Sequence, residues 1–167
     1  INWNKVKADG YDFAFIRVGY GTHSGSAYKH VTDSRFHEYA KGANSAGIPL
    51  GTYVYCYART VEEAVADADF AIGKMQGYTI SYPVVIDLEA TRLTSLGKSR
   101  ITDIAVAFCD RVRAAGYIPM VYCNENWYKS YIDTSRLSDV DFWVARYNSK
   151  YNTGMKRTIW QCCSKGR

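Results

Sequence analysis

The chain lacks several features that mark common functional classes. Its 167 residues contain no apolar run close to the roughly 20 residues that a membrane-spanning helix needs, so we expect no membrane span. The net charge of +5 is spread along the chain without a block of lysine or arginine, so we expect no nucleic-acid partner. No linker or low-complexity tract divides residues 1–167, which predicts a single domain.

The N-terminus carries no visible signal for a compartment. The chain begins at Ile1 without a methionine, and no signal peptide can be recognised. We therefore interpret the chain as a processed or trimmed product.

Cysteine and histidine occur without the spacing of a metal site or a disulfide framework. The five cysteines include no CxxC pair, and Cys56, Cys109 and Cys123 lie in apolar segments, which favours small core side chains over a disulfide scaffold. The adjacent Cys162 and Cys163 have no role that we can assign. No HExxH pattern occurs, so we predict no metal site and no cofactor, and we expect the three histidines at the surface or in loops: His23, His30 and His37.

Aromatic residues, in contrast, are abundant. They make up 15% of the chain, with 15 tyrosines and 4 tryptophans. Tyr and Trp combine a flat apolar face with a polar group, which suits sugar rings and other amphipathic ligands. We expect most of them to pack in the core, and a minority to line a ligand pocket.

Strand-like and helix-like segments alternate along the chain. The strand candidates are short and rich in Val, Ile, Phe and Tyr, as buried parallel strands are, and they cover Phe13–Val18, Leu50–Tyr57, Val84–Leu88, Met120–Asn124, Phe142–Ala145 and Thr158–Gln161. Helices are predicted over Thr32–Ala46, from a capping box at Thr60 to Gly77, and over Thr102–Ala115. Repeated strand–helix units predict an α/β fold with a parallel sheet, either a barrel or an open doubly wound sheet.

Two acids follow one of these strands. The stretch "YPVVIDLEA" places Asp87 and Glu89 on one face, because side chains alternate along a strand. Parallel sheets bind ligands at the carboxyl ends of their strands, so polar residues at the other strand ends should surround the acids. These residues are Arg17, Tyr53, Tyr55, Tyr57, Tyr122, Asn124, Trp143, Tyr147 and Gln161. Such a ring is typical of a pocket for a polyhydroxyl ligand.

The spacing of the two acids suits glycoside cleavage. Two carboxyl groups this close repel when both are ionised, so one pKa is expected to rise. Glycosidases use such a pair, with one carboxyl protonated as general acid and the other ionised. Positions two apart on a strand lie roughly 6.5–7 Å from each other. Side-chain rotamers then allow either the retaining or the inverting separation, so the stereochemical outcome stays open.

Other interpretations of the same pair stay open at this point. Acids at a strand end also bind Mg²⁺ or cap the following helix, and a metal-dependent phosphoryl-transfer enzyme would use Asp87 and Glu89 in that way. The fragment Gly97-Lys98-Ser99 does not indicate a P-loop, because Arg92 stands where the first glycine is needed and no strand leads into the tripeptide.

Six segments occur in order along nearly the whole chain. They are "DFAFIRVGYG" (Asp12–Gly21), "AGIPLGTYVYCYA" (Ala46–Ala58), "YPVVIDLE" (Tyr82–Glu89), "AGYIPMVYCN" (Ala115–Asn124), "FWVARYN" (Phe142–Asn148) and "IWQ" (Ile159–Gln161). In this order and spacing the sequence resembles the glycoside hydrolase family 25 lysozymes, the Chalaropsis-type N-acetylmuramidases of bacteria and phages.

The resemblance implies a flattened, TIM-like (β/α) barrel that cleaves the β-1,4 bond between N-acetylmuramic acid and N-acetylglucosamine in bacterial peptidoglycan. It implies that Glu89, in the D-x-E motif, is the proton donor, and that Asp87 assists a neighbouring-group step through the acetamido group of the substrate. No metal and no cofactor are implied. The partner would be peptidoglycan glycan strands, and the location extracellular or cell-wall associated.

The resemblance also implies roles for the residues around the acids. Arg17 is expected to hold the carboxylates in place. The tyrosine-rich strand of Tyr53, Tyr55 and Tyr57, Tyr122 with Asn124, and the Trp143/Tyr147 segment resemble sugar-contacting positions of the family.

The sequence departs from the family pattern at both ends. Family members begin with a D-V-S-x-x-Q strand before the "INW" segment and end with a V-D-x-N strand after the "WQ" motif, and each strand carries a site acid. We therefore expect a barrel that is incomplete at both chain ends and lacks its first and last strands. A weakly active or inactive glycan-binding remnant is the alternative to an active lysozyme. Open barrel edges would favour homo-oligomers.

Overall fold

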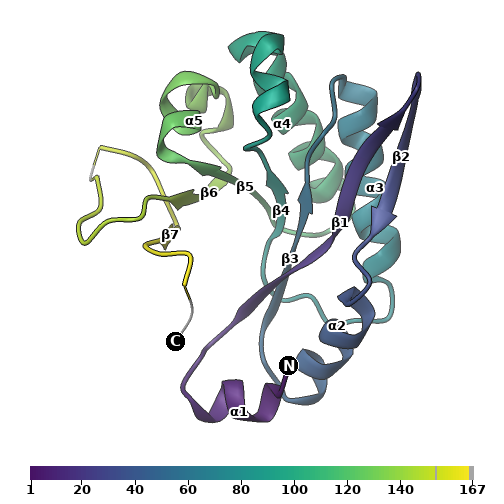
Figure 1. Ribbon diagram of the computed structural model, residues 1–167, viewed down its shortest axis with the longest axis vertical. Coiled ribbons are helices and arrows are strands. Elements are labelled where there is room, and N and C mark those ends of the chain that lie inside the picture. Colours follow the sequence, from purple (N-terminus) through teal and green to yellow (C-terminus); the bar gives the residue numbers. More distant parts are fainter. Residues whose placement is uncertain (153, 166–167) are drawn as a thin grey trace.

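The apolar segments of the chain form one seven-stranded sheet (Figure 1). The computed structural model describes residues 1–152 and 154–165. In the order β2-β1-β3-β4-β5-β6-β7, every neighbouring pair is parallel except β1 and β2. The strands are β1 (Ala14–Ser24), β2 (Ala27–Thr32), β3 (Leu50–Tyr55), β4 (Val84–Asp87), β5 (Pro119–Asn124), β6 (Asp141–Ala145) and β7 (Ile159–Gln161).

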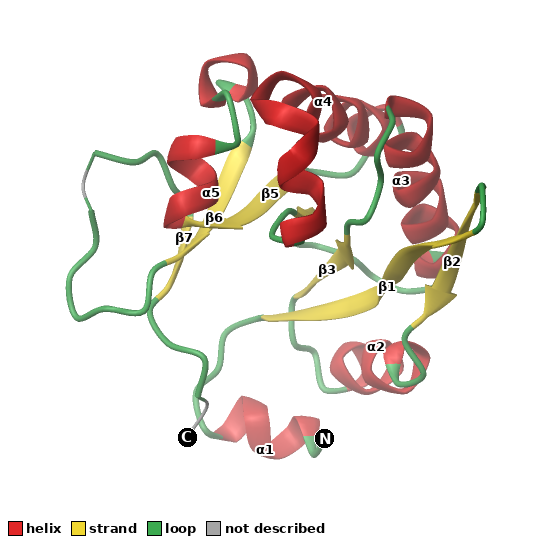
Figure 2. Cartoon of the chain, turned by 45° about the horizontal axis from the view of Figure 1, so that its top comes forward, coloured by secondary structure: helices red, strands yellow, loops and turns green. Residues whose placement is uncertain are grey.

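Helices pack on the outer side of the curved sheet, as Figure 2 shows for α2 to α5. The α-helices are α1 (Trp3–Ala8), α2 (Phe36–Ser45), α3 (Val61–Met75), α4 (Gly97–Ala114) and α5 (Glu125–Ser130), and the 3₁₀ turns are η1 (Thr91–Leu96) and η2 (Thr134–Leu137). None of the helices in the described ranges has the length and apolar character needed to cross a bilayer. The predicted α/β fold with a parallel sheet is confirmed, and the sheet is not closed into a barrel.

The N-terminal half differs from the prediction in one feature, a β-hairpin. Strand β1 continues to Ser24, and Ser24 pairs with Ala27 of β2 across a two-residue turn. Gly25 has φ +62°, a value that glycine adopts without the steric cost of a Cβ. Because β2 occupies Ala27–Thr32, the predicted helix Thr32–Ala46 begins only at Phe36. Strand β2 is not predicted from the sequence, because it is an edge strand of mixed polarity rather than an apolar run.

The core divides into two layers, one on each face of the sheet. The outer layer joins the sheet to the helices and contains fully buried residues such as Ile86, Leu88 and Phe108. The smaller inner layer contains Val85, Met120, Tyr122 and Ala145, with Phe15, Tyr53, Trp143 and Ile159 packed against it. Each fully buried Leu, Ile or Phe side chain contributes about 1.5–3 kcal/mol to the stability of the folded state. Because side chains alternate along a strand, Val85 and Asp87 of β4 lie on the inner face and Ile86 lies on the outer one.

The predicted helix signals are partly confirmed. Thr60 caps α3, since its Oγ1 accepts a hydrogen bond from Glu63 N at 3.3 Å, while the Glu63 carboxylate accepts from Arg59 N at 2.6 Å. Gly77 follows α3 with φ +87°, as its role as a stop requires. Helix α4 begins at Gly97 instead of Thr102, because η1 leads directly into it. Three predicted core cysteines are buried: Cys56, Cys109 and Cys123.

The β1–β2 hairpin is held on α3 by a buried polar cluster. Asp67 of α3 is fully buried and accepts hydrogen bonds from Tyr28 Oη and His30 Nε2, both at 2.8 Å. His23 lies 3.0 Å from Glu63 Oε1. The prediction of surface or loop histidines is therefore wrong for His23 and His30, which lie on strands and are largely buried. It is right for His37, which is exposed on α2.

We expect Asp67→Leu to lower the free energy of unfolding by about 2–4 kcal/mol, because two buried donors lose their acceptor. Asp69→Asn on the same helix is the control, since Asp69 pairs with Arg111 at a half-exposed site and should cost under about 1 kcal/mol. Urea unfolding followed by tryptophan fluorescence measures both. Equal losses in the two variants would contradict a structural role for the buried cluster.

Candidate functional site

The two acids lie at the carboxyl end of the central strand β4. All four residues of β4 are buried, and Asp87, its last residue, pairs with Tyr55 of β3 and Tyr122 of β5. Asp87 is 6% exposed and Glu89 is half-buried. A continuous apolar run thus carries one carboxyl group into the interior of the sheet and leaves the second near the surface.

A small pocket brings six of the predicted residues together. It has a volume of about 180 Å³ and is lined by Tyr53, Asp87, Glu89, Tyr122, Trp143 and Gln161. The Trp143 ring forms its aromatic wall, with its centroid 4.9 Å from that of Tyr122 and 6.5 Å from that of Tyr53. These side chains come from strands β3 to β7, whose carboxyl ends meet at one edge of the sheet.

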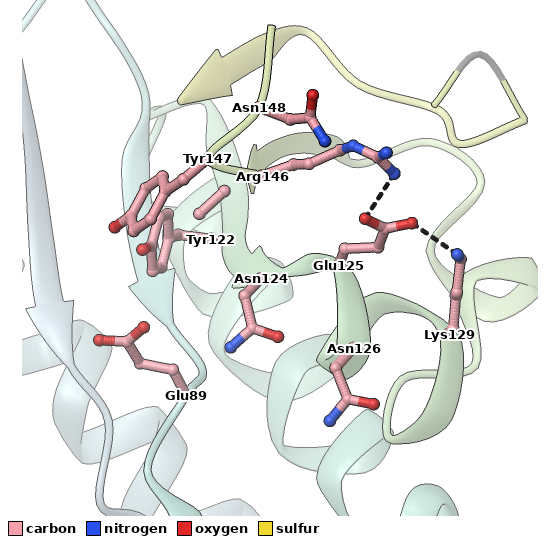
Figure 3. Close-up of a pocket in the computed structure, with 10 residues that line it drawn as sticks. Glu89, Tyr122, Asn124, Glu125, Asn126, Lys129, Arg146, Tyr147 and Asn148 are labelled. Atoms are coloured by element: carbon pink, nitrogen blue, oxygen red, sulfur yellow. Dashed lines mark hydrogen bonds and ion pairs between the residues drawn. The ribbon is translucent and has the colours of Figure 1, made fainter. Parts of the chain in front are cut away.

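A larger cavity of about 680 Å³ adjoins the small pocket and shares Glu89 and Tyr122 with it (Figure 3). Its other walls come from β5, α5 and the segment after β6, and its remaining lining residues are Asn124, Glu125, Asn126, Lys129, Ala145, Arg146, Tyr147 and Asn148. Glu89 is the acid that reaches both spaces, whereas Asp87 lines the small pocket alone.

Burial shifts both acids toward their protonated forms. Burial, and then the neighbouring Glu89, raise the pKa of Asp87 to about 8, against a smaller opposing effect of Arg17. Burial also raises the pKa of Glu89, and a hydrogen bond with Tyr122 acts in the opposite direction. Within the described part of the chain, Asp87 Oδ1 is buried without a hydrogen-bond partner. The pair therefore holds a proton at neutral pH and leaves one acceptor unsatisfied.

Neutral phenols surround the acids. Burial raises the pKa of Tyr55 to about 12, with a further contribution from Glu89. Burial also raises the pKa of Tyr122 and Tyr53, and the nearby carboxyl groups act in the same direction. These hydroxyl groups therefore stay protonated and can donate hydrogen bonds to a carboxylate or a sugar oxygen.

Arg17 pairs with Asp33, an acid that the sequence analysis did not name. Its guanidinium binds Asp33, with Nε and Nη2 at 2.8 and 2.7 Å from Oδ2, and it is 43% exposed. Two of the Arg17 donors, Nε and Nη2, therefore go to Asp33. Arg17 still acts on Asp87 through space, lowering its pKa. Sequence reasoning missed Asp33, which follows the unpredicted strand β2.

The other predicted residues contact one another or neighbouring elements. Tyr55 and Tyr57 contact each other, with ring centroids 4.9 Å apart, and the Arg92 guanidinium covers the Tyr57 ring at 3.4 Å. Asn124 caps α5, since its Oδ1 accepts from Trp127 N at 3.0 Å, and its amide nitrogen is directed toward Glu89 in Figure 3. Gln161 Nε2 donates to Tyr147 Oη at 3.2 Å.

Sequence reasoning missed the charged wall of the larger cavity. Glu125, Lys129 and Arg146 line it, together with Asn126 and Asn148. The signal was partly available, because Glu125 directly follows the end of β5 and Arg146 directly follows β6. Their meeting depends on α5, a six-residue helix too short to be recognised from periodicity. In the described ranges, no group of three or more His, Cys, Asp or Glu side chains is placed to hold a metal ion.

Comparison with known proteins gives consistent matches. The chain is 28% identical over 149 residues to the autolytic lysozyme of Clostridium acetobutylicum, covering 88% of this chain and 41% of that protein. The CTP1L endolysin has a similar fold, with a TM-score of 0.82 at 23% identity over 100% of this chain and 57% of that one. The catalytic domain of endolysin ply40, from bacteriophage P40 of Listeria monocytogenes, gives a TM-score of 0.76 at 26% identity over 100% of this chain and 80% of that one.

The chain therefore spans less than two thirds of the length of the first two of these relatives. The sequence profile of glycosyl hydrolases family 25 matches residues 1–167, which is the whole chain. The mostly parallel α/β sheet agrees with that match. The chain belongs to glycosyl hydrolases family 25.

Proposed function

We propose that this chain is a muramidase. It would hydrolyse the β-1,4 bond between N-acetylmuramic acid and N-acetylglucosamine in bacterial peptidoglycan, acting outside the cell or at the cell wall. The observation that carries the proposal is the pair Asp87 and Glu89, which share one tyrosine-lined pocket and both have raised pKa values. Family membership and the likeness to an autolytic lysozyme support the same reaction class.

Glu89 suits the role of proton donor. It is half-buried, and it borders both the small pocket and the larger cavity, so a glycosidic oxygen lying between them can reach it. Its raised pKa keeps a proton available, as general acid catalysis requires. Transfer of that proton to the leaving oxygen would accompany cleavage of the bond from that oxygen to the anomeric carbon.

Asp87 suits the role of assisting group. It lies at the buried end of the small pocket, and its Oδ1 has no hydrogen-bond partner among the described residues. An acetamido N–H of the substrate would satisfy this acceptor, which would favour the ionised form of Asp87 and shift the shared proton toward Glu89. The acetamido oxygen would then bond to the anomeric carbon as the bond from that carbon to the leaving oxygen breaks. A water molecule would later attack the anomeric carbon and displace the acetamido oxygen.

The surrounding residues would bind the sugar. Trp143 offers an aromatic face, and Tyr53, Tyr122 and Gln161 offer hydrogen-bonding groups in the same small pocket. Tyr147 and Asn124 line the adjoining cavity and would contact the next sugar along the strand. A glycan strand would thus lie across the carboxyl ends of β3 to β7 with its scissile bond at Glu89.

We expect Glu89→Gln to reduce the clearing of Gram-positive cell walls by about 10²–10⁴-fold, because the amide has no proton to donate at the glycosidic oxygen. Loss of turbidity measures the rate. Glu38→Gln is the matched control, since Glu38 is exposed on α2 and should leave the rate unchanged.

The same assay tests two alternatives. Sedimentation of the protein with cell walls without clearing, in both the parent chain and Glu89→Gln, would favour a glycan-binding protein without catalysis. Loss of clearing on addition of a metal chelator would favour a metal-dependent reaction of Asp87 and Glu89 instead.

The rate should fall on the alkaline side with an apparent pKa near 8. Asp87 has a pKa raised to about 8, so the pair keeps one proton below that pH and loses it above, and a doubly ionised pair has no proton to transfer. A profile of kcat/KM against pH on soluble glycan measures this limb. In Asp87→Asn the limb should move to lower pH, because the proton then titrates from Glu89 alone. An alkaline limb already present near pH 5 in the parent chain would contradict the coupling.

We also propose weak self-association through an edge of the open sheet. Among the described residues, the outer edge of β7 pairs with no strand, whereas the β2 edge carries the exposed Lys29, a charge that opposes pairing. Sedimentation velocity over a concentration series should show a reversible dimer that a proline in place of Trp160 abolishes. A monomer at every concentration would contradict it.

A further inference from the structure

A charged cluster forms the wall of the 680 Å³ cavity on the side away from Glu89 (Figure 3). It consists of Glu125 and Lys129 of α5 and of Arg146, which directly follows β6. The proposed cleavage uses Glu89, Asp87 and the aromatic pocket, and leaves this wall without a role. Its chemistry differs from that of the small pocket, which no lysine or arginine among the described residues lines.

The cluster carries a net positive charge. The Glu125 carboxylate accepts from Lys129 Nζ at 2.6 Å and from Arg146 Nη1 at 2.7 Å, so two cations face one anion and a charge of +1 remains. The hydrogen bond from Lys129 is the largest of several effects that lower the pKa of Glu125, which keeps it ionised at neutral pH. Glu125 thereby fixes both cations at the cavity wall.

Both cations keep donor groups for a ligand. Arg146 uses Nε on the Lys150 carbonyl at 3.1 Å and Nη1 on Glu125, while its Nη2 makes no hydrogen bond within the described ranges. Lys129 has three N–H donors and its side chain is 52% exposed, against 27% for Arg146. The two side chains can therefore bind a solvent-accessible group that enters the cavity.

A carboxylate is the ligand that this wall favours. Charge-assisted hydrogen bonds from guanidinium and ammonium groups to carboxylates are stronger than those to neutral hydroxyls. A glycan strand of N-acetylglucosamine alone has no anionic group, whereas each muramic acid carries a lactyl carboxyl, either free or extended by a peptide that bears carboxylates of its own. The cavity adjoins the scissile position, so a substituent there can extend into it.

We propose that Arg146 and Lys129 bind a carboxylate carried by the muramyl residue and thereby determine a preference for anionic peptidoglycan over neutral β-1,4-linked N-acetylglucosamine chains. The inference rests on the proposed function for its substrate class. Substrate specificity then depends on the wall formed by α5 and by Arg146 after β6, whereas cleavage depends on Asp87 and Glu89.

The test compares three soluble oligosaccharides with the same backbone. One carries the peptide, one has a free lactyl carboxylate, and in the third this carboxylate is converted to a neutral methyl amide. Binding is measured by calorimetry in the Glu89→Gln background, so that cleavage does not interfere. The parent chain is assayed for cleavage of the same three compounds.

We expect Lys129→Gln and Arg146→Gln each to weaken binding of the carboxylate-bearing compounds by about 10-fold, with little change for the methyl amide. A loss confined to the peptide-bearing compound would locate the bound carboxylate on the peptide, and a loss confined to the compound with the free lactyl carboxylate would locate it on the lactyl group. A loss on both anionic compounds would show that the two cations bind either carboxylate. Lys41→Gln on α2 is the matched control, since it removes the same charge far from the cavity and should bind all three compounds as the parent does.

Two results would overturn the proposal: equal losses on all three compounds, or no loss on any. Lys129→Gln keeps the Arg146–Glu125 ion pair, and Arg146→Lys keeps the charge, so the test remains decisive if Arg146→Gln fails to fold. Failure of the proposed function gives a different result, in which the parent chain cleaves none of the compounds while the binding comparison still reports on the cations.

Discussion

The burial of two carboxyl groups at the end of β4 is the constraint on which the rest of the site depends. Asp87 is held in the interior by a strand that is buried on both faces, and Glu89 follows at the rim. Burial raises both pKa values, and proximity raises that of Asp87 further. A charged pair would be costly in that position, so the pair retains a proton, which is the property that acid catalysis requires.

The two-layer core makes this burial possible. Alternation along β4 assigns Ile86 to the layer shared with the helices and Asp87 to the inner face, where Tyr53, Tyr122 and Trp143 line the small pocket and supply neutral donors. The outer layer contributes most of the apolar burial. The inner layer is smaller and ends in a cavity, so the sheet face that contributes less to stability is the one that holds the two acids.

The charged residues fall into clusters with separate functions. Asp67, fully buried, ties the β1–β2 hairpin to α3 through Tyr28 and His30 and lies outside the pockets that contain the acids. Glu125 lies at a cavity wall and pairs with two cations whose side chains stay partly exposed. An acid has a structural role where it is enclosed with its partners, as Asp67 is, and its partners can bind a ligand where they stay accessible, as those of Glu125 do.

The parallel α/β sheet and the position of Asp87 and Glu89 at a strand end could be predicted from the residues alone, because the two-residue period of a strand and the meeting of strand ends follow from backbone geometry. The residues alone also placed Tyr53, Tyr122, Trp143 and Gln161 in one pocket with these acids. The pairing of Arg17 with Asp33, and the meeting of Glu125 with Lys129 and Arg146, depend instead on the packing of the folded chain. Side-chain partners from distant segments depend on how strand β2 and helix α5 pack, and neither element has a local pattern strong enough to reveal that packing.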